Sequence, residues 1–271
     1  MSLLRINNNI SALNTQRHLN VNSFNLGKSL EKLSSGFRIN TGADGPADLI
    51  ISEHLRSEIS GIKAAMRNSQ EASNLIGIAE GALTEIGNML SSMRSLAVHA
   101  ANTGVVSTAQ IAADQQEVDN ALDTIDRIAT TTRFGGDPVF AKGSVTFQVG
   151  YGASTDDQVG YTFVLVNTSA LGIASLDVTA STAIADIEGA ISGVASIRGD
   201  LGAFQKNTLQ TNINSLSVTL ENVTATESYI RDANMAEETS NFTRSQILVQ
   251  AGVAMLAQAN VLSQSVLGLL T

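Results

Sequence analysis

Residues 46–102 read PADLIISEHLRSEISGIKAAMRNSQEASNLIGIAEGALTEIGNMLSSMRSLAVHAAN, and this stretch decides the fold. Pro46 suits the first turn of a helix, and the next proline is Pro138. At ~1.5 Å per residue, an unbroken helix of this length would extend on the order of 80 Å, which indicates a bundle or an assembly. Its packed face is predicted to carry Leu55, Ile59, Ile62, Met66, Ser69, Ala72, Ile76, Ala79, Leu83, Ile86, Leu90, Met93, Ala97 and Ala100. The steps alternate between three and four residues, with one interruption where a second three-residue step runs from Ser69 to Ala72.

The chain then turns back and changes character. Residues 102–104, Asn-Thr-Gly, are typical of a helix end, and apolar spacing over 111–132 predicts an antiparallel return helix. Beyond a Gly-rich turn, residues 145–149 and 161–166 alternate or cluster apolar side chains, which predicts two strands. A small β-hairpin is therefore expected between the helices.

Helical spacing resumes over residues 184–230. Tryptophan is absent and aromatics are 4% of the chain, so small and aliphatic side chains must supply most of the packing. The predicted fold class is mainly α: a long antiparallel helical bundle or coiled coil with a small β-hairpin insert at about residues 137–170.

Composition and spacing argue against several kinds of chemistry. A net charge of −9 opposes nucleic-acid binding, and the absence of cysteine excludes disulfides and thiolate sites. His18, His54 and His99 lie far apart, so no metal site is expected. The S-x-x-K spacing occurs in residues 29–32 and 60–63 without the companion elements of a serine enzyme. We expect no cofactor and no enzymatic activity.

The C-terminal stretch has no charged residue after Arg244, a run long enough to cross a bilayer. Amide and hydroxyl side chains interrupt this run, which favours a packing seam over a membrane span. The apolar line of that seam comprises Leu248, Gly252, Met255, Ala259, Leu262, Val266 and Leu269. No membrane partner is expected.

The N-terminal stretch carries a shorter apolar line through Leu3, Ile6, Ile10 and Leu13. It lacks a basic region ahead of a long apolar core and a small-residue cleavage site, so a conventional cleaved secretion signal is not expected. Short amphipathic segments of this kind gain too little by burial to order alone, and we expect them to order when neighbouring copies pack against them.

Several motifs at the two ends resemble those of bacterial flagellins. The N-terminal ones are Asn14-Thr15, LSSGFRIN at 33–40 and Ile-Ser-Glu at 51–53. The C-terminal ones are IRDANMAEE at 230–238, SQIL at 245–248, Gln-Ala-Gly at 250–252 and AMLAQAN at 254–260. The resemblance covers roughly residues 1–140 and 170–271, which leaves room for the hairpin but not for a large outer domain.

The resemblance implies a subunit that polymerises with itself along an open helical symmetry into an extracellular filament for motility. Residues 1–42 and 236–271 would form its inner layer, and residues 43–235 an outer helical rod. Inter-subunit packing is predicted for Ile6, Ile10, Leu13, Leu248, Met255, Leu262, Val266 and Leu269. The family further implies unfolded export through the flagellar type III pathway, a chaperone on the C-terminal segment, and hook-associated junction and cap proteins as partners.

A second activity is implied by resemblance alone. Residues 89–98 correspond to the helix that Toll-like receptor 5 recognises in stimulatory flagellins, with Arg94 and Leu96 on that helix and Glu117 on the return helix as matching contacts. Ser92 replaces the arginine of the family pattern, so weakened recognition is expected. The alternative is that these residues pack against neighbouring subunits.

Two other functions compete with the filament subunit. A hook-filament junction protein shares helical ends but usually matches the C-terminal motif less well, and it would cap growth instead of polymerising. An enzyme or adhesin built on the same core would need a substantial inserted domain, for which the middle of this chain has little space.

Overall fold

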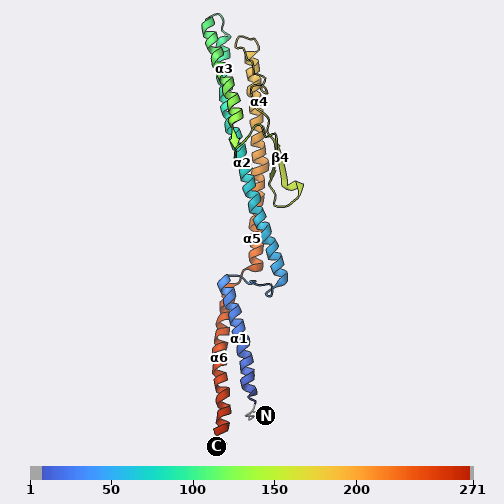
Figure 1. Cartoon of the computed structure of the whole chain (residues 1–271), viewed down its shortest axis with the longest axis vertical. Helices are drawn as coiled ribbons and strands as arrows, with labels where there is room; N and C mark the ends of the chain where they lie inside the picture. Colours follow the sequence, from blue (N-terminus) through green and yellow to red (C-terminus); the bar gives the residue numbers. More distant parts are fainter. Residues whose placement is uncertain (1–7, 269–271) are drawn as a thin grey trace. The chain divides into compact units, whose positions relative to one another are not determined.

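The computed structural model of the chain describes residues 8–268, with side chains described up to residue 261. The chain divides into two compact units, one formed by residues 1–57 with 223–271 and the other by residues 58–222. The helices, coloured along the chain in Figure 1, are α1 (Ile10–Ser35), α2 (Pro46–Ala100), α3 (Thr108–Thr131), α4 (Ala183–Phe204), α5 (Thr211–Arg231) and α6 (Met235–Gly268). This confirms the predicted mainly helical fold with a small β insert.

The core face of α2 follows an unbroken heptad pattern from Ile62 to Ala100. Each of its positions is at most 2% exposed: Ile62, Ala65, Ser69, Ala72, Ile76, Ala79, Leu83, Ile86, Leu90, Met93, Ala97 and Ala100. The sequence line was wrong at one position, because it passed through Met66 instead of Ala65. Strict alternation of three- and four-residue steps keeps one helix face towards its partner. Ala65 fits this spacing and Met66 does not, so the smaller side chain is the buried one.

Helix α3 returns beside α2 within the second unit (Figure 1), as the sequence predicts. The Ser107 side chain accepts the backbone N–H of Gln110 at the start of α3, and the Gln110 side chain accepts the backbone N–H of Ser107, so both groups are capped. Val118 and Ile125 of α3 join the same apolar core as α2 and α4.

The β insert consists of two small antiparallel pairs. Strand β1 (Arg133–Phe134) pairs with β2 (Asp137–Pro138), and β3 (Ser144–Gln148) pairs with β4 (Gln158–Thr162). The predicted second strand at 161–166 is therefore displaced towards the N-terminus. Pairing ends at Thr162, opposite the first residue of β3, and the residues beyond it have no strand partner. Phe163 and Val166 are buried as loop residues instead.

Helices α4 and α5 are joined by η2 (Gln205–Gln210), a π-helical segment that the sequence reasoning did not predict. The buried positions Ile187, Val194 and Leu201 are seven residues apart, whereas Leu209 follows Leu201 by eight. The wider π-helical turn accommodates the additional residue and returns Leu209 to the buried face. None of the helices in the described residues is long and apolar enough to span a membrane.

Candidate assembly surface

Helices α1 and α6 of the first unit pack against each other in antiparallel orientation. At one end the Asn9 side-chain amide donates to the Ala259 carbonyl at 2.9 Å, and at the other Lys32 Nζ lies 3.8 Å from Glu238 Oε2. Between them, Leu19 of α1 faces Gly252 of α6 so closely that a Cβ added at Gly252 would lie 3.2 Å from Leu19 Cδ1.

The seam between the two helices follows heptad spacing and contains both large apolar and small or polar side chains. On α1 the less exposed positions are Ala12, Thr15, Leu19, Asn22, Leu26, Ser29 and Leu33. On α6 they are Glu238, Phe242, Ser245, Val249, Gly252, Leu256 and Ala259. The small residues let the helices approach closely, and side chains such as Leu19, Phe242 and Leu256 supply apolar surface that the pairing partly covers.

Other large apolar side chains of α1 and α6 lie on their outward faces. Between 44% and 64% of the surface of each is exposed in Ile10, Leu13, Val21, Phe24, Ile247, Leu248, Val253, Met255 and Val261. A helix that is apolar on every face is normally buried, and contiguous exposed apolar surface marks an interaction site. These nine residues are called the outward apolar set below.

Four of the predicted packing residues belong to this set: Ile10, Leu13, Leu248 and Met255. The other four, Ile6, Leu262, Val266 and Leu269, lie outside the described side chains. In the predicted C-terminal line, Gly252 and Ala259 turn towards α1 while Leu248 and Met255 point outwards. Sequence periodicity did not separate these two roles, because apolar residues occur on every side of α6.

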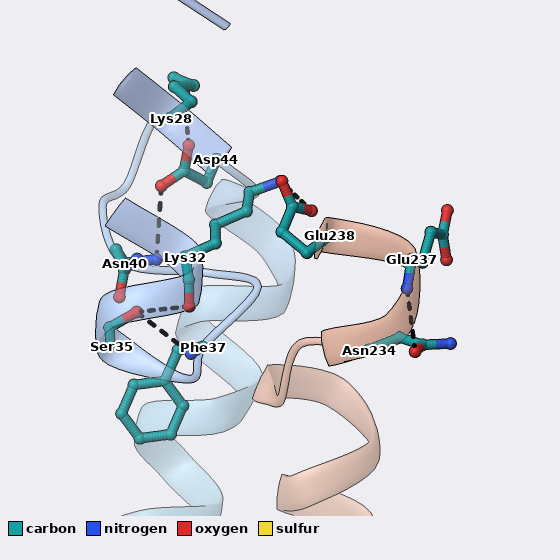
Figure 2. Close-up of polar contacts among 9 residues, drawn as sticks. All are labelled: Lys28, Lys32, Ser35, Phe37, Asn40, Asp44, Asn234, Glu237 and Glu238. Carbon is teal, nitrogen blue, oxygen red and sulfur yellow. Dashed lines mark hydrogen bonds and ion pairs between the residues drawn. The ribbon is translucent and has the colours of Figure 1, made fainter. Parts of the chain in front are cut away.

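The connections at the base of this helix pair bond to each other. Gly36 ends α1 with φ 77°, a left-handed conformation that glycine adopts without strain. The Arg38 N–H then donates to the Arg231 carbonyl at 2.7 Å, and the Ala233 N–H donates to the Gly36 carbonyl at 2.9 Å. The α1–α2 loop and the α5–α6 link thus form a short antiparallel bridge. Asn234 begins α6 by accepting the Glu237 N–H at 3.4 Å (Figure 2).

Asp44 holds the α1–α2 loop against α1. Its carboxylate lies 2.5 Å from Lys28 Nζ and accepts both the N–H and the hydroxyl of Thr41 at 2.9 Å and the Asn40 N–H at 3.3 Å. Figure 2 shows Lys28 and Asn40 converging on this carboxylate. The Lys28 ammonium first, and then the Thr41 donors, hold the pKa of Asp44 well below its ordinary value, and Asp44 in turn raises the pKa of Lys28.

Arg231, the last residue of α5, fastens the bridge from the other side. Its guanidinium lies 2.9 Å from Glu53 Oε1 and stands over the Phe37 ring, 4.9 Å from the ring centre. Glu53 also accepts from Arg56, and the two cations, Arg231 before Arg56, lower the pKa of Glu53. The base of the α1–α6 pair is therefore held by backbone pairing, charge and ring stacking together.

Charge is divided unequally between the two units. The unit formed by residues 1–57 and 223–271 contains eight basic and eight acidic side chains, whereas residues 58–222 contain eight basic and seventeen acidic ones. The whole net charge of −9 thus belongs to the second unit. The unit that exposes the outward apolar set is neutral, so copies of it can approach without long-range repulsion.

The predicted receptor contacts lie in the second unit, on α2 and α3. Arg94 bonds to Glu188 of α4, with Nη2 2.7 Å from the carboxylate, and Glu117 is exposed on α3. Leu96 is half-buried against the core, about 200° around α2 from Arg94. These contacts remain a prediction. Within the described residues no group of three His, Asp or Glu side chains could hold a metal ion.

Long paired helices with large apolar side chains on their outer faces define a fibrous structural class of protein. Two family profiles match the sequence: the bacterial flagellin N-terminal helical region over residues 6–144 and the bacterial flagellin C-terminal helical region over residues 184–270.

Full-length relatives agree with these profiles. The chain is 41% identical to the flagellin of Bacillus subtilis, over 98% of this chain and 100% of that protein, and 41% identical to the flagellin of Halalkalibacterium halodurans, over 98% and 99%. It is 37% identical to the flagellar filament 33 kDa core protein of Treponema phagedenis, over 98% and 99%. A crystal structure of Bacillus cereus flagellin is similar with a TM-score of 0.47 and 25% identity, over 55% of this chain and 88% of that one.

The chain belongs to the bacterial flagellin family, and as a flagellin it is a structural subunit of the flagellar filament.

Proposed function

We propose that this flagellin polymerises by burying the outward apolar set of α1 and α6 against neighbouring copies. The observation that carries the proposal is that the α1–α6 pair leaves nine large apolar side chains exposed on its outward faces, in addition to those that are partly covered at its seam. Fully burying one such side chain gains about 1.5–3 kcal/mol, so a set of this size outweighs the loss of freedom on association.

Assembly and the ordering of the ends are coupled in this proposal. The isolated pair leaves the outward apolar set in contact with solvent, and neighbouring copies supply the stabilisation that comes from burying this set. The same surface, repeated along an open helical symmetry, produces a filament whose inner layer is residues 1–42 and 236–271, with residues 43–235 outside it. Predicted packing by Ile6, Leu262, Val266 and Leu269 belongs to this inner layer.

The test is seeded growth followed by electron microscopy. The full chain, the double variant Leu248→Asn/Met255→Asn and the control Val105→Asn are each added to short filament seeds. Val105 is 83% exposed but lies in the turn between α2 and α3. Long filaments from the full chain and the control, but not from the double variant, are expected. Elongation by the double variant at the rate of the full chain would contradict the proposal.

The same experiment separates the filament subunit from a junction protein. A full chain that binds at seed ends without elongating them would act as a junction or cap component. A chain lacking residues 245–271 is expected to fail in both respects, because it lacks all five members of the outward apolar set that lie on α6.

Export and its partners follow from family membership as further parts of the proposal. The chain leaves the cell unfolded through the flagellar type III pathway, and a chaperone covers the apolar C-terminal segment before export. Hook-associated junction and cap proteins delimit the filament at its ends. The absence of charge from residue 245 to 271 supports a chaperone-covered segment. Titrating purified flagellar export chaperone against the full chain and the chain lacking residues 245–271 tests this, and equal affinity for both would argue against it.

Weakened recognition by Toll-like receptor 5 is the second proposed activity. It rests on Ser92, which is exposed on α2 where the family pattern has an arginine, and on Arg94, which is engaged by Glu188. A receptor reporter assay with monomeric protein should give a weak response that Ser92→Arg strengthens. Full potency of the unchanged monomer would reject weakened recognition.

A further inference from the structure

The second unit contains a polar layer at the edge of its apolar core, in which Ser69 is buried and Ser73, Gln205 and Asn212 are half-buried. Ser69 is fully buried on the heptad face of α2 between Ile62 and Ile76. Its hydroxyl lies 3.4 Å from the side-chain nitrogen of Asn212, and the Ser73 hydroxyl, one turn further on, accepts from the side-chain amide of Gln205 at 2.9 Å. Two amides of one helical rod thus meet two hydroxyls of the facing helix.

This layer coincides with the π-helical segment η2. Gln205 is the first residue of η2, and Asn212 follows its last residue by two. Gln205 therefore lies within the stretch where the buried spacing changes from seven residues to eight, between Leu201 and Leu209, and Asn212 lies just after it. An additional residue could be accommodated at any level of a uniform apolar seam, but matched polar partners exist at this level.

The same layer contacts the β insert. The Asn212 amide also donates to the Val149 carbonyl at 2.8 Å, and the Asn68 amide of α2 donates to the Gln148 carbonyl at 3.1 Å. Both carbonyls lie at the end of β3. One asparagine therefore connects α2, α5 and the hairpin.

We infer that Ser69, Ser73, Gln205 and Asn212 form a register lock. The lock fixes the additional residue at η2, sets α5 against α2 at one of the registers that an apolar seam would allow, and positions the β3–β4 hairpin. Buried polar groups select one arrangement at a cost in stability, because their alternatives leave amides and hydroxyls without partners.

The first test replaces the lock by apolar side chains of similar size. In the variant Ser69→Ala/Ser73→Ala/Gln205→Leu/Asn212→Leu, the midpoint of thermal unfolding should stay the same or rise, while deuterium uptake at residues 144–150 rises several-fold. The control Gln210→Leu/Asn214→Leu removes an exposed Gln–Asn hydrogen bond on the same rod and should leave that uptake unchanged. A lower midpoint with unchanged uptake would make the layer a simple stabilising contact and overturn the inference.

The second test moves the register directly. Deleting Asn207, an exposed residue of η2, restores seven-residue spacing between Leu201 and Leu209. This deletion should shift the midpoint of thermal unfolding by ~3 °C or less. Deleting the exposed Gly189 of α4 displaces both Val194 and Leu201 before η2 can compensate, and should lower the midpoint several times more. Equal losses from the two deletions would show that η2 has no special role in register.

Discussion

Gly252 determines how closely α6 approaches α1, because any side chain there would press on Leu19. Gly27 of α1 offers a matched position, since a Cβ added there meets nothing within 4 Å. Valine has a higher helix propensity than glycine, so Gly27→Val should be neutral or stabilising. Gly252→Val should separate the helices and slow seeded filament growth at least several-fold. Equal growth rates in the two variants would indicate that close approach is not needed.

Asp44 gives the α1–α2 loop an acid-sensitive contact. Because the folded-state pKa of Asp44 lies below its ordinary value of 3.8, the contact with Lys28 stabilises the folded chain above that value and is lost as the pH falls below it. Asp44→Asn should therefore lower the thermal midpoint at about pH 7, and the gap between variant and unchanged protein should narrow towards about pH 3. A gap of the same size at both pH values would mean that Asp44→Asn acts through the shape of the side chain and not through its charge.

Helix α2 shows how stability is distributed along one element. Leu83 is fully buried on its heptad face, whereas Val98 of the same helix is half-exposed. Leu83→Ala should lower the free energy of unfolding by about 2–5 kcal/mol, and Val98→Ala by about 0.5 kcal/mol or less, as measured by urea denaturation. Comparable losses at the two positions would mean that the heptad face does not carry the stability of this unit.

At the scale of the whole molecule, a neutral assembling unit is joined to a unit of net charge −9. Packing many copies brings like charges together, so salt should accelerate growth. Seeded elongation should be faster at ~150 mM salt than at ~10 mM, because the screening length is about 30 Å at ~10 mM and falls to about 8 Å at ~150 mM. Neutralising exposed acidic residues, as in Glu85→Gln/Asp123→Asn, should reduce this salt dependence. Slower growth at the higher salt would instead point to attractive ion pairs between subunits.

Sequence periodicity by itself determined the helices, their approximate ends and the presence of a small β insert. Helix α2 illustrates why: a run without proline from Pro46, with apolar side chains at steps of three and four, has no other structure that buries them. The end motifs likewise sufficed to place the chain in its family, because several long motifs in the right order are specific.

Tertiary structure alone decided which faces pack and where the register changes. On the core face of α2 the buried residue is Ala65 and not Met66. On α6, Gly252 faces α1 while Leu248 stays exposed. In both places close approach of the helices selects small side chains, which hydropathy does not rank highly. Strand β4 ended at Thr162 because its partner ended. The π-helical segment η2 arose because eight residues had to fit where seven repeat, and a buried pattern of that kind is recognised only against the facing helix.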